Sequence, residues 1–269
     1  MEAGALSPRA RARPRVAVVV PALDEEDALA RVLSDLPREH LDLLVVVDNG
    51  SEDATGRVAL EGGARVVREE RRGYGQACLT GIDVVLGRRP PDRPDPLDPP
   101  LEPLGPDGVV CFLDADHSDF PEELPLVLAP VLAGRADLVV GSRLQQGAGA
   151  RALLPQARYG NRLACFLMRV LFGARHTDLG PFRAIRVDAL EHLGMCDRDF
   201  GWTVEMQLKA CVAGLRVVEV PVSYRARSGH SKITGTLLGT LRAGWKILGW
   251  ILGLRLALWV TRPRIPRFR

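Results

Sequence analysis

Residues Val109 to Phe120 read VVCFLDADHSDF, which places two aspartates, Asp114 and Asp116, directly after five apolar residues. The apolar run predicts a buried strand. Alternate residues at a strand end point in roughly the same direction, so the two carboxylates are expected to lie close together. Their repulsion has to be relieved by a cation or by hydrogen-bond donors. A hard divalent ion that bridges the carboxylates and a phosphate ligand would meet this requirement.

Apolar strands and amphipathic helices alternate on both sides of this stretch. The pattern predicts strands at 15–21, 43–47, 64–67, 109–113 and 137–140, and helices at 25–36, 53–61, 74–86 and 121–133. Such an alternation predicts an α/β fold, with a Rossmann-like, mostly parallel sheet covered by helices on both faces. Ligands of these sheets bind beyond the carboxyl ends of the strands.

Distinctive polar segments follow the five predicted strands. They are PALDEED (21–27), DNGSEDAT (48–55), REERRGYGQA (68–77), DADHSD (114–119) and GSR (141–143). Taken singly, Asp24 and Asp53 are equally well explained as helix N-caps, and Asn49-Gly50 as a common turn. The GYG at 73–75 lacks the third glycine of a dinucleotide fingerprint and follows the third strand, so it is a weak indication of an NAD site.

Composition limits the classes of protein to consider. The chain has 269 residues, 46% of them hydrophobic, which suits one main domain. The residues after 219 include ten basic and no acidic side chains, whereas the first 219 hold 26 basic and 33 acidic ones. The positive charge of the C-terminal end indicates an anionic neighbour, and we expect no nucleic acid partner. Five scattered cysteines without a CxxC pair indicate reduced cytosolic thiols rather than a zinc site or a disulfide framework.

The chain divides into three predicted parts. Residues 1–14 are expected to be a disordered lead-in without the apolar core of a signal peptide. Residues 15–235 form the main domain, and the eight prolines between 87 and 108 predict an exposed insertion. Residues 236–269 form a helix with a basic tail, and its apolar stripe is Leu237, Leu241, Trp245, Leu248, Leu252, Leu256 and Trp259.

The C-terminal helix is expected to be amphipathic and to lie in a membrane interface. Its most apolar part, 245–260, includes Lys246 and Arg255 and is shorter than the roughly 20 uncharged residues of a spanning helix. Tryptophans and flanking cations suit an anionic membrane surface. In the alternative, the helix packs on the domain or on a second subunit of a homodimer.

Seven blocks in order carry a family resemblance. They are VVVPALDEED, VVVDNGSEDAT, GYGQACLTGI, FLDADHSDFPEEL, VVGSR, DLGPFRAI and VPVSYRARSGHSKI. Together they resemble family 2 glycosyltransferases with the GT-A fold. Within that family they are similar to the polyprenyl-phosphate (undecaprenyl- or dolichyl-phosphate) sugar transferases, such as dolichol-phosphate mannosyltransferase.

The resemblance implies an inverting transferase that moves a hexose from a nucleotide-diphosphate sugar to a polyprenyl phosphate. UDP-glucose and GDP-mannose are the first donors to consider, Mg²⁺ or Mn²⁺ is the implied cofactor, and the cytoplasmic face of the membrane is the implied location. A soluble family 2 enzyme with a hydroxyl acceptor, or a non-catalytic nucleotide-sugar binder, are the alternatives. A nucleotidyltransferase is disfavoured, because no GxGTR-like loop follows the first strand.

The resemblance also assigns expected roles to individual residues. Metal ligands are Asp114 and Asp116, and Ser118 stands where related enzymes often have a glutamine that meets the metal. Nucleotide-sugar-binding residues are Pro21, Ala22, Asp24, Glu25, Asp48, Gly75, Gln76, Asp114, Ala115, Asp116, Arg225, Ser231 and Lys232. Acceptor-binding residues are Arg143, Arg158 and Arg183, and catalytic residues are Asp116, Arg143, Asp178 and Glu205.

Two of these assignments have alternatives. Asp178 and Glu205 could act as a base for a hydroxyl acceptor, could orient the acceptor and the arginines, or could be ordinary capping or ion-pairing groups. The segment with Arg225, Arg227, Ser231 and Lys232 could close over the donor phosphates or be an ordinary charged surface loop. A phosphate acceptor needs no strong base, because its second pKa is about 6.

Overall fold

A computed structural model describes residues 13–92, 100–145, 152–226, 237–261 and 268. Most of the predicted lead-in, residues 93–99 of the proline-rich insertion, and both Ser231 and Lys232 lie outside the described residues. The boundaries proposed at 15 and 235 therefore stay predictions.

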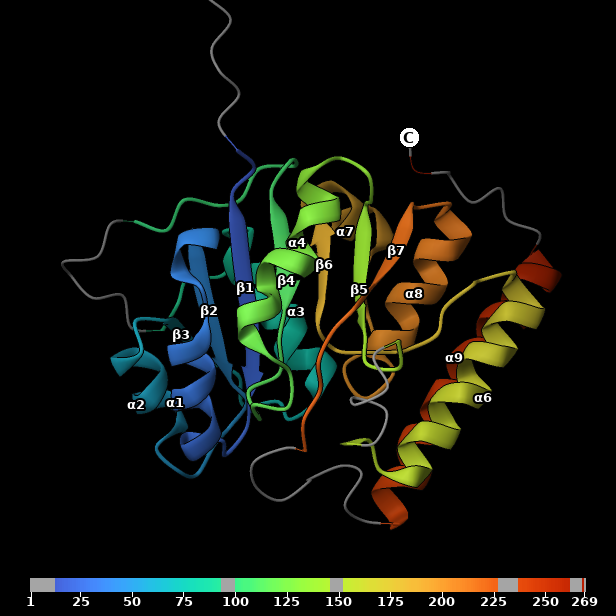
Figure 1. Ribbon diagram of the computed structural model, residues 1–269, viewed down its shortest axis with the longest axis horizontal. Coiled ribbons are helices and arrows are strands. Elements are labelled where there is room, and N and C mark those ends of the chain that lie inside the picture. Colours follow the sequence, from blue (N-terminus) through green and yellow to red (C-terminus); the bar gives the residue numbers. More distant parts are fainter. Residues whose placement is uncertain (1–12, 93–99, 146–151, 227–236, 262–267, 269) are drawn as a thin grey trace, which may run out of the picture.

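Seven strands form one sheet in the order β3-β2-β1-β4-β6-β5-β7 (Figure 1). Their bounds are β1 Val16–Ala22, β2 Leu43–Asp48, β3 Arg65–Arg68, β4 Val109–Phe112, β5 Leu138–Ser142, β6 Arg183–Arg186 and β7 Val217–Pro221. All neighbours pair in parallel except β6, which is antiparallel to both β4 and β5. The predicted mostly parallel sheet is confirmed, and its five predicted strands are present with ends shifted by one or two residues.

Helices cover both faces of the sheet. They are α1 Glu26–Asp35, α2 Thr55–Glu61, α3 Tyr74–Val85, α4 Leu124–Leu132, α6 Pro155–Phe172, α7 Val187–Leu193, α8 Trp202–Ala213 and α9 Leu237–Thr261. Short 3₁₀ turns occupy Arg38–His40 and Pro121–Glu123, the second forming the start of the helix predicted at 121–133. Side chains of α1, α2 and α4 complete the core on one face, and those of α3, α7 and α8 complete it on the other.

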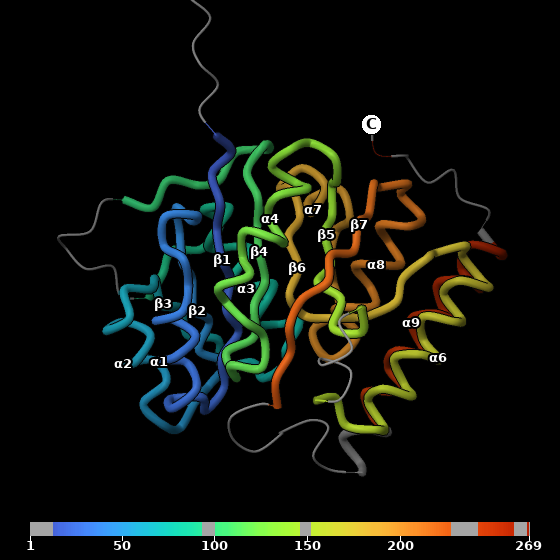
Figure 2. The backbone as a smooth tube through the Cα atoms, viewed as in Figure 1, coloured from blue at the N-terminus to red at the C-terminus, as the bar shows by residue number. Residues whose placement is uncertain are grey.

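Helices α6 and α9 lie side by side beyond the β7 edge of the sheet (Figures 1 and 2). Together with α8 they enclose a third apolar cluster, to which α9 contributes the fully buried Ile251 and the partly buried Ile247, Trp250 and Leu254. Of the predicted stripe, Trp245, Leu252, Leu256 and Trp259 are exposed, Trp245 to 81% and Trp259 to 72%, and Leu248 is partly exposed. The helix therefore packs on the domain through one face and presents these four side chains outward, whereas the side chains of Leu237 and Leu241 lie outside the described part.

Among the described residues, one helix is long and apolar enough to cross a membrane by length and composition. This segment, 242–260, has 19 residues and a mean hydropathy of 1.3. Lys246 and Arg255 are both exposed on it. Length alone does not distinguish a spanning helix from an interfacial one.

Candidate active site

A cavity of about 340 Å³ lies beyond the carboxyl ends of β1, β2 and β4. Its volume is in the usual range for a small-molecule site. The lining residues are Pro21, Ala22, Leu23, Glu25, Asn49, Arg72, Gly73, Tyr74, Ala77, Asp114, Ala115, Asp116, Asp199 and Phe200. They come from the ends of three strands, the start of α3 and the loop before α8, so chain segments far apart in sequence form one site.

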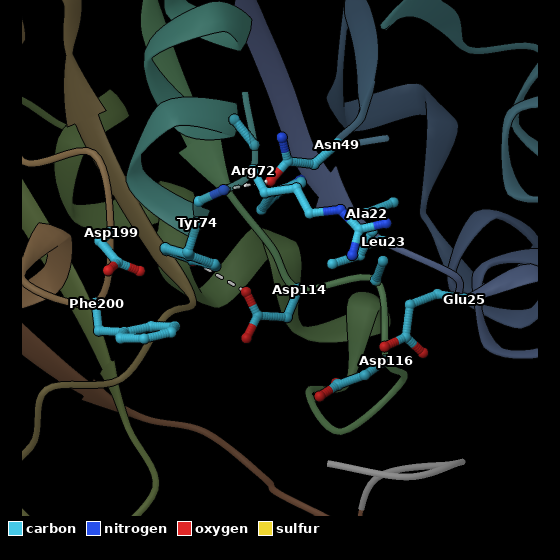
Figure 3. Close-up of a pocket in the computed structure, with 14 residues that line it drawn as sticks. Ala22, Leu23, Glu25, Asn49, Arg72, Tyr74, Asp114, Asp116, Asp199 and Phe200 are labelled. Atoms are coloured by element: carbon cyan, nitrogen blue, oxygen red, sulfur yellow. Dashed lines mark hydrogen bonds between the residues drawn. The ribbon is translucent and has the colours of Figure 1, made fainter. Parts of the chain in front are cut away.

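The two aspartates of the DADHSD segment both line this cavity. Tyr74 donates a hydrogen bond from its hydroxyl to Asp114 Oδ1 at 2.9 Å, and the backbone N–H of Ser118 donates to Asp116 Oδ1 at 2.9 Å. Figure 3 shows Asp114 between Tyr74 and Asp116, with Asp199 and Phe200 across the cavity from Glu25. Burial and the charge of Asp114 raise the pKa of Tyr74, which therefore stays a hydrogen-bond donor.

These residues fit a divalent cation shared between protein and ligand. No cluster of three or more His, Cys, Asp or Glu side chains suited to a metal occurs among the described residues, and the DADHSD segment offers the cavity two carboxylates. Magnesium is commonly held in this way, by one or two carboxylates and the phosphates of a substrate. Near Asp116, both buried carboxylate oxygens of Asp119 have no hydrogen-bond partner in the described part of the chain. Such orphaned oxygens suit a polar ligand or a cation nearby.

Asp119 is 1% exposed. Burial raises the pKa of its carboxyl well above the ordinary value, and the neighbouring charge of Asp114 adds to this. Both effects disfavour the charged form, so Asp119 holds its proton to a higher pH than an ordinary aspartate.

A second cluster joins the end of β5 to the segment before β6. Asp178 is fully buried and accepts hydrogen bonds from Arg143 Nε and Nη2, both at 2.8 Å, and from the Arg143 N–H at 2.9 Å. The Arg143 guanidinium also lies over the ring of Tyr224, 5.0 Å from its centroid. Burial alone would raise the pKa of Asp178, but the charge and hydrogen bonds of Arg143 outweigh burial and lower it. The Asp178 carboxylate therefore orients the Arg143 guanidinium.

A comparison of the sequence with known protein families shows to which family the chain belongs. The model of "Glycosyl transferase family 2" matches residues 17–194, which include β2 to β6, nearly all of β1, and both Asp114 and Asp116. The chain belongs to glycosyltransferase family 2. This glycosyltransferase is 37% identical over 237 residues to an uncharacterized glycosyltransferase of Mycobacterium tuberculosis, a match that covers 87% of this chain and 97% of the relative.

Relatives with more specific names confirm the resemblance to polyprenyl-phosphate sugar transferases. The undecaprenyl-phosphate mannosyltransferase of Micrococcus luteus is 32% identical over 265 residues, which cover 89% of this chain and all of the relative. A solved structure of the glucosyl-3-phosphoglycerate synthase of M. tuberculosis, in complex with Mn²⁺ and UDP, has a TM-score of 0.63 at 21% identity. It covers 91% of this glycosyltransferase and 80% of the synthase, and it shows that the fold is GT-A.

The structure brings six of the predicted donor-site residues of this glycosyltransferase to the cavity. These are Pro21, Ala22, Glu25, Asp114, Ala115 and Asp116. Four others do not line it: Asp24, Asp48, Gly75 and Gln76. The Asp48 carboxylate accepts a hydrogen bond from the Ser51 N–H at 2.8 Å and pairs with Arg68 at 3.2 Å, so it holds the loop after β2. Asp24 accepts from the Glu52 N–H at 2.7 Å.

Three predicted site residues of this glycosyltransferase bind other parts of the protein instead of an open site. Arg183 is fully buried and donates to the carbonyls of Gly180 and Thr203, and burial lowers its pKa to about 10. Glu205 is also fully buried, and its carboxylate accepts hydrogen bonds from the N–H groups of Cys196 and Asp197, each at 2.8 Å. Neither side chain is accessible in this structure, and the expected acceptor-binding role of Arg183 and catalytic role of Glu205 stay predictions.

Arg225 is the third of these residues. Its guanidinium donates to the His117 carbonyl at 2.7 Å and stacks on Phe120, 4.0 Å from the ring centroid. It thus holds the loop that carries Asp116 and does not line the cavity, and its expected part in closing over the donor phosphates stays a prediction. Arg158 is partly buried on α6, and its Nε has no hydrogen-bond partner in the described residues.

Sequence reasoning missed several lining residues of this glycosyltransferase. Tyr74 was visible in the GYG segment, but nothing in the sequence showed that its hydroxyl would reach Asp114. Asn49 holds the loop after β3, because its amide donates to the carbonyls of Glu69 at 3.0 Å and Arg71 at 2.8 Å. Asp199 and Phe200 precede α8, and no motif marked them.

Proposed function

We propose that this glycosyltransferase transfers a hexose, with inversion, from a nucleotide-diphosphate sugar to a polyprenyl phosphate at the cytoplasmic surface of a membrane. The observation that carries the proposal is that Asp178 and Glu205, the two acids expected as a base for a hydroxyl acceptor, are buried, and that Asp178 binds Arg143, whose guanidinium suits a phosphate. Sequence identity of about a third to an undecaprenyl-phosphate mannosyltransferase supports the same acceptor class.

In this proposal, the nucleotide-sugar donor binds in the cavity. Asp114 and Asp116 would hold Mg²⁺ or Mn²⁺, which neutralises charge on the departing nucleoside diphosphate. Tyr74 fixes the orientation of Asp114, and the loops after β1 and β2 provide the walls for the nucleoside. UDP-glucose and GDP-mannose are the donors to examine first.

In this proposal, Arg143 binds the phosphate of the acceptor. Its Nε and Nη2 are bound to Asp178, so the plane of the guanidinium is fixed before an acceptor arrives. A planar guanidinium recognises phosphate oxygens with defined geometry. A phosphate monoester is already largely anionic near neutral pH and attacks without losing a proton. An acceptor that needs no base is consistent with a site in which Asp178 and Glu205, the two candidate bases, are buried within the protein.

Two exposed apolar faces support action at a membrane. On α6, the residues Tyr159, Leu163, Phe166 and Val170 follow helical spacing and are 70%, 50%, 60% and 63% exposed. On α9, the outward residues are Trp245, Leu252, Leu256, Trp259 and Val260. Arg162 and Arg169 are exposed on α6, which is the mixture of apolar and basic side chains typical of interfacial helices.

A hydroxyl acceptor is the second candidate, and Asp199 is the observation in its favour. Asp199 lines the cavity, and burial raises the pKa of its carboxyl, which makes it a better base. Under this alternative Asp199 would take the proton of an attacking hydroxyl.

One transfer assay separates the two. Purified protein in detergent is incubated with Mn²⁺, a panel of labelled sugar nucleotides, and either undecaprenyl phosphate or a water-soluble alcohol or sugar. The proposal predicts label in the organic phase, lost with EDTA, with Asp116→Asn or with Arg143→Met, and retained with Asp199→Asn. Label on a water-soluble product only, abolished by Asp199→Asn, would contradict the lipid phosphate acceptor.

A further inference from the structure

The loop at 196–201, between α7 and α8, contacts the donor cavity on one side and α9 on the other. Asp199 and Phe200 line the cavity (Figure 3). Cys196, Asp197 and Arg198 line a second groove together with Trp245, Lys246 and Trp250 of α9. A short segment thus separates the site for the sugar nucleotide from the C-terminal helix.

Asp197 connects this loop to α9 through its two carboxylate oxygens. Oδ1 accepts hydrogen bonds from the N–H groups of Asp199 at 2.8 Å and Gly201 at 3.1 Å. Oδ2 accepts from Trp250 Nε1 at 2.6 Å and pairs with Lys246 Nζ at 3.1 Å. Asp197 is 4% exposed, so these bonds are shielded from water. One oxygen therefore shapes the cavity wall, and the other binds the helix.

Packing leaves this loop little room to move. A Cβ on Gly201 would come within 2.5 Å of both Asp197 Oδ2 and the Trp250 ring, so glycine is required at this contact. On the other side, a Cβ on Gly73 or Gly75 would clash with the carbonyl oxygens of Arg198 and Asp197. The Gln76 N–H also donates to the Arg198 carbonyl at 2.9 Å. The loop is held between the start of α3, which lines the cavity, and α9.

We infer that α9 helps to shape the donor site. Trp250 and Lys246 bind Asp197, and through Asp197 they act as positioning residues for Asp199 and Phe200. The inference rests on the proposed function, because it takes the cavity to be the site of the nucleotide sugar. The opposite face of α9 presents Trp245 and Trp259 outward, so one helix joins the proposed membrane contact to the wall of the donor cavity.

The test compares two tryptophan variants of the full chain in detergent. Trp250→Phe removes the N–H donor and keeps the aromatic packing, whereas Trp259→Phe, on the same helix, changes a side chain that is 72% exposed and does not line the second groove. Binding of UDP and GDP with Mn²⁺ is measured by calorimetry without acceptor. Trp250→Phe is expected to weaken nucleotide binding by about 3- to 30-fold, the range of couplings carried through packed contacts, and Trp259→Phe to leave it unchanged.

Steady-state kinetics and hydrogen exchange provide readouts that a general loss of stability would not move. Trp250→Phe should raise the donor KM and leave the acceptor KM unchanged. Asp197→Asn should reproduce this effect, because the amide oxygen can still accept from the loop while the NH₂ group cannot accept from Trp250. Amide exchange of 196–201 should rise in both variants and stay unchanged in Trp259→Phe.

The outcomes separate this inference from the proposed function. Wild-type donor affinity together with wild-type exchange in Trp250→Phe and Asp197→Asn would overturn the role of α9. Failure of the wild-type protein to bind any nucleotide with Mn²⁺ would overturn the proposed function, whereas the exchange measurement would still report whether α9 holds the loop. If Trp250→Phe fails to fold, Asp197→Asn decides the outcome.

Discussion

Replacing Asp178 with asparagine separates an orienting role for this carboxylate from a catalytic one. Asp178 is fully buried and binds an Arg143 side chain that is 13% exposed, with two guanidinium contacts at 2.8 Å. The substitution would leave the guanidinium buried without an anion. Removing one partner of a buried ion pair costs about 3–5 kcal/mol, so Asp178→Asn should lower the free energy of unfolding by that amount.

Urea denaturation followed by circular dichroism measures the change. The matched control is Glu61→Gln, which breaks an exposed ion pair with Arg57 at 2.8 Å and should cost less than about 1 kcal/mol. The double variant Asp178→Asn, Arg143→Met should recover part of the loss, because no uncompensated charge remains.

The pH dependence of Asp178→Asn has a defined sign. Arg143 lowers the pKa of Asp178 in the folded state, so the pair contributes stability above the unfolded value of about 3.9 and loses it as the pH falls through the folded pKa. The difference between wild type and Asp178→Asn should therefore shrink in acid. A variant with wild-type stability at pH 7 that has lost kcat alone would refute the orienting role and indicate a base.

Three further predictions concern the cavity and the outer helix face. Tyr74→Phe should weaken Mn²⁺ binding, measured by electron paramagnetic resonance of the free ion, by about tenfold, because groups that orient metal ligands typically contribute this much; unchanged affinity would show that Tyr74 does not position Asp114. Asp119→Asn should raise the free energy of unfolding at pH 7 in EDTA. Burial raises the pKa of Asp119 in the folded state, so the wild type loses stability as the pH rises above the unfolded value of about 3.9 and the gain should vanish toward that pH; a destabilised variant at pH 7 would contradict the raised pKa. Phe166→Glu on α6 should reduce flotation with anionic vesicles by about tenfold or more, since burial of a phenylalanine contributes about 1.5–3 kcal/mol; Leu60→Glu on α2 is the control, and equal flotation of both variants would exclude α6 from the membrane contact.

The sequence predicted the fold through its strand periodicity and the order of its motifs. Five buried apolar runs predicted β1 to β5, whereas β6 and β7 were not predicted from the sequence. The antiparallel pairing of β6 depends on contacts with β4 and β5 that no local pattern encodes. The C-terminal stripe was recognised correctly as apolar, yet periodicity could not show that Ile247, Trp250 and Ile251 would form the packed face.

Site residues that directly follow a strand could be predicted from the sequence. Residues whose position depends on contacts with distant segments of the chain could not. Asp114 and Asp116 reach the cavity because β4 ends at Phe112 and aims the following residues at its rim. Burial of Arg183 and Glu205 could not be predicted, because each is enclosed by backbone groups from other segments. Phe200 and Asp199 enter the cavity only because α8 packs on the sheet behind them.

The most direct measurement of the central claim is a crystal structure of the full chain with Mn²⁺ and the nucleotide sugar that the transfer assay selects. The account predicts an anomalous manganese peak at coordination distance from Asp114 and Asp116, with the diphosphate on the same ion and the sugar directed toward Arg143. A diphosphate bound elsewhere, with both aspartates contacting protein only, would contradict it.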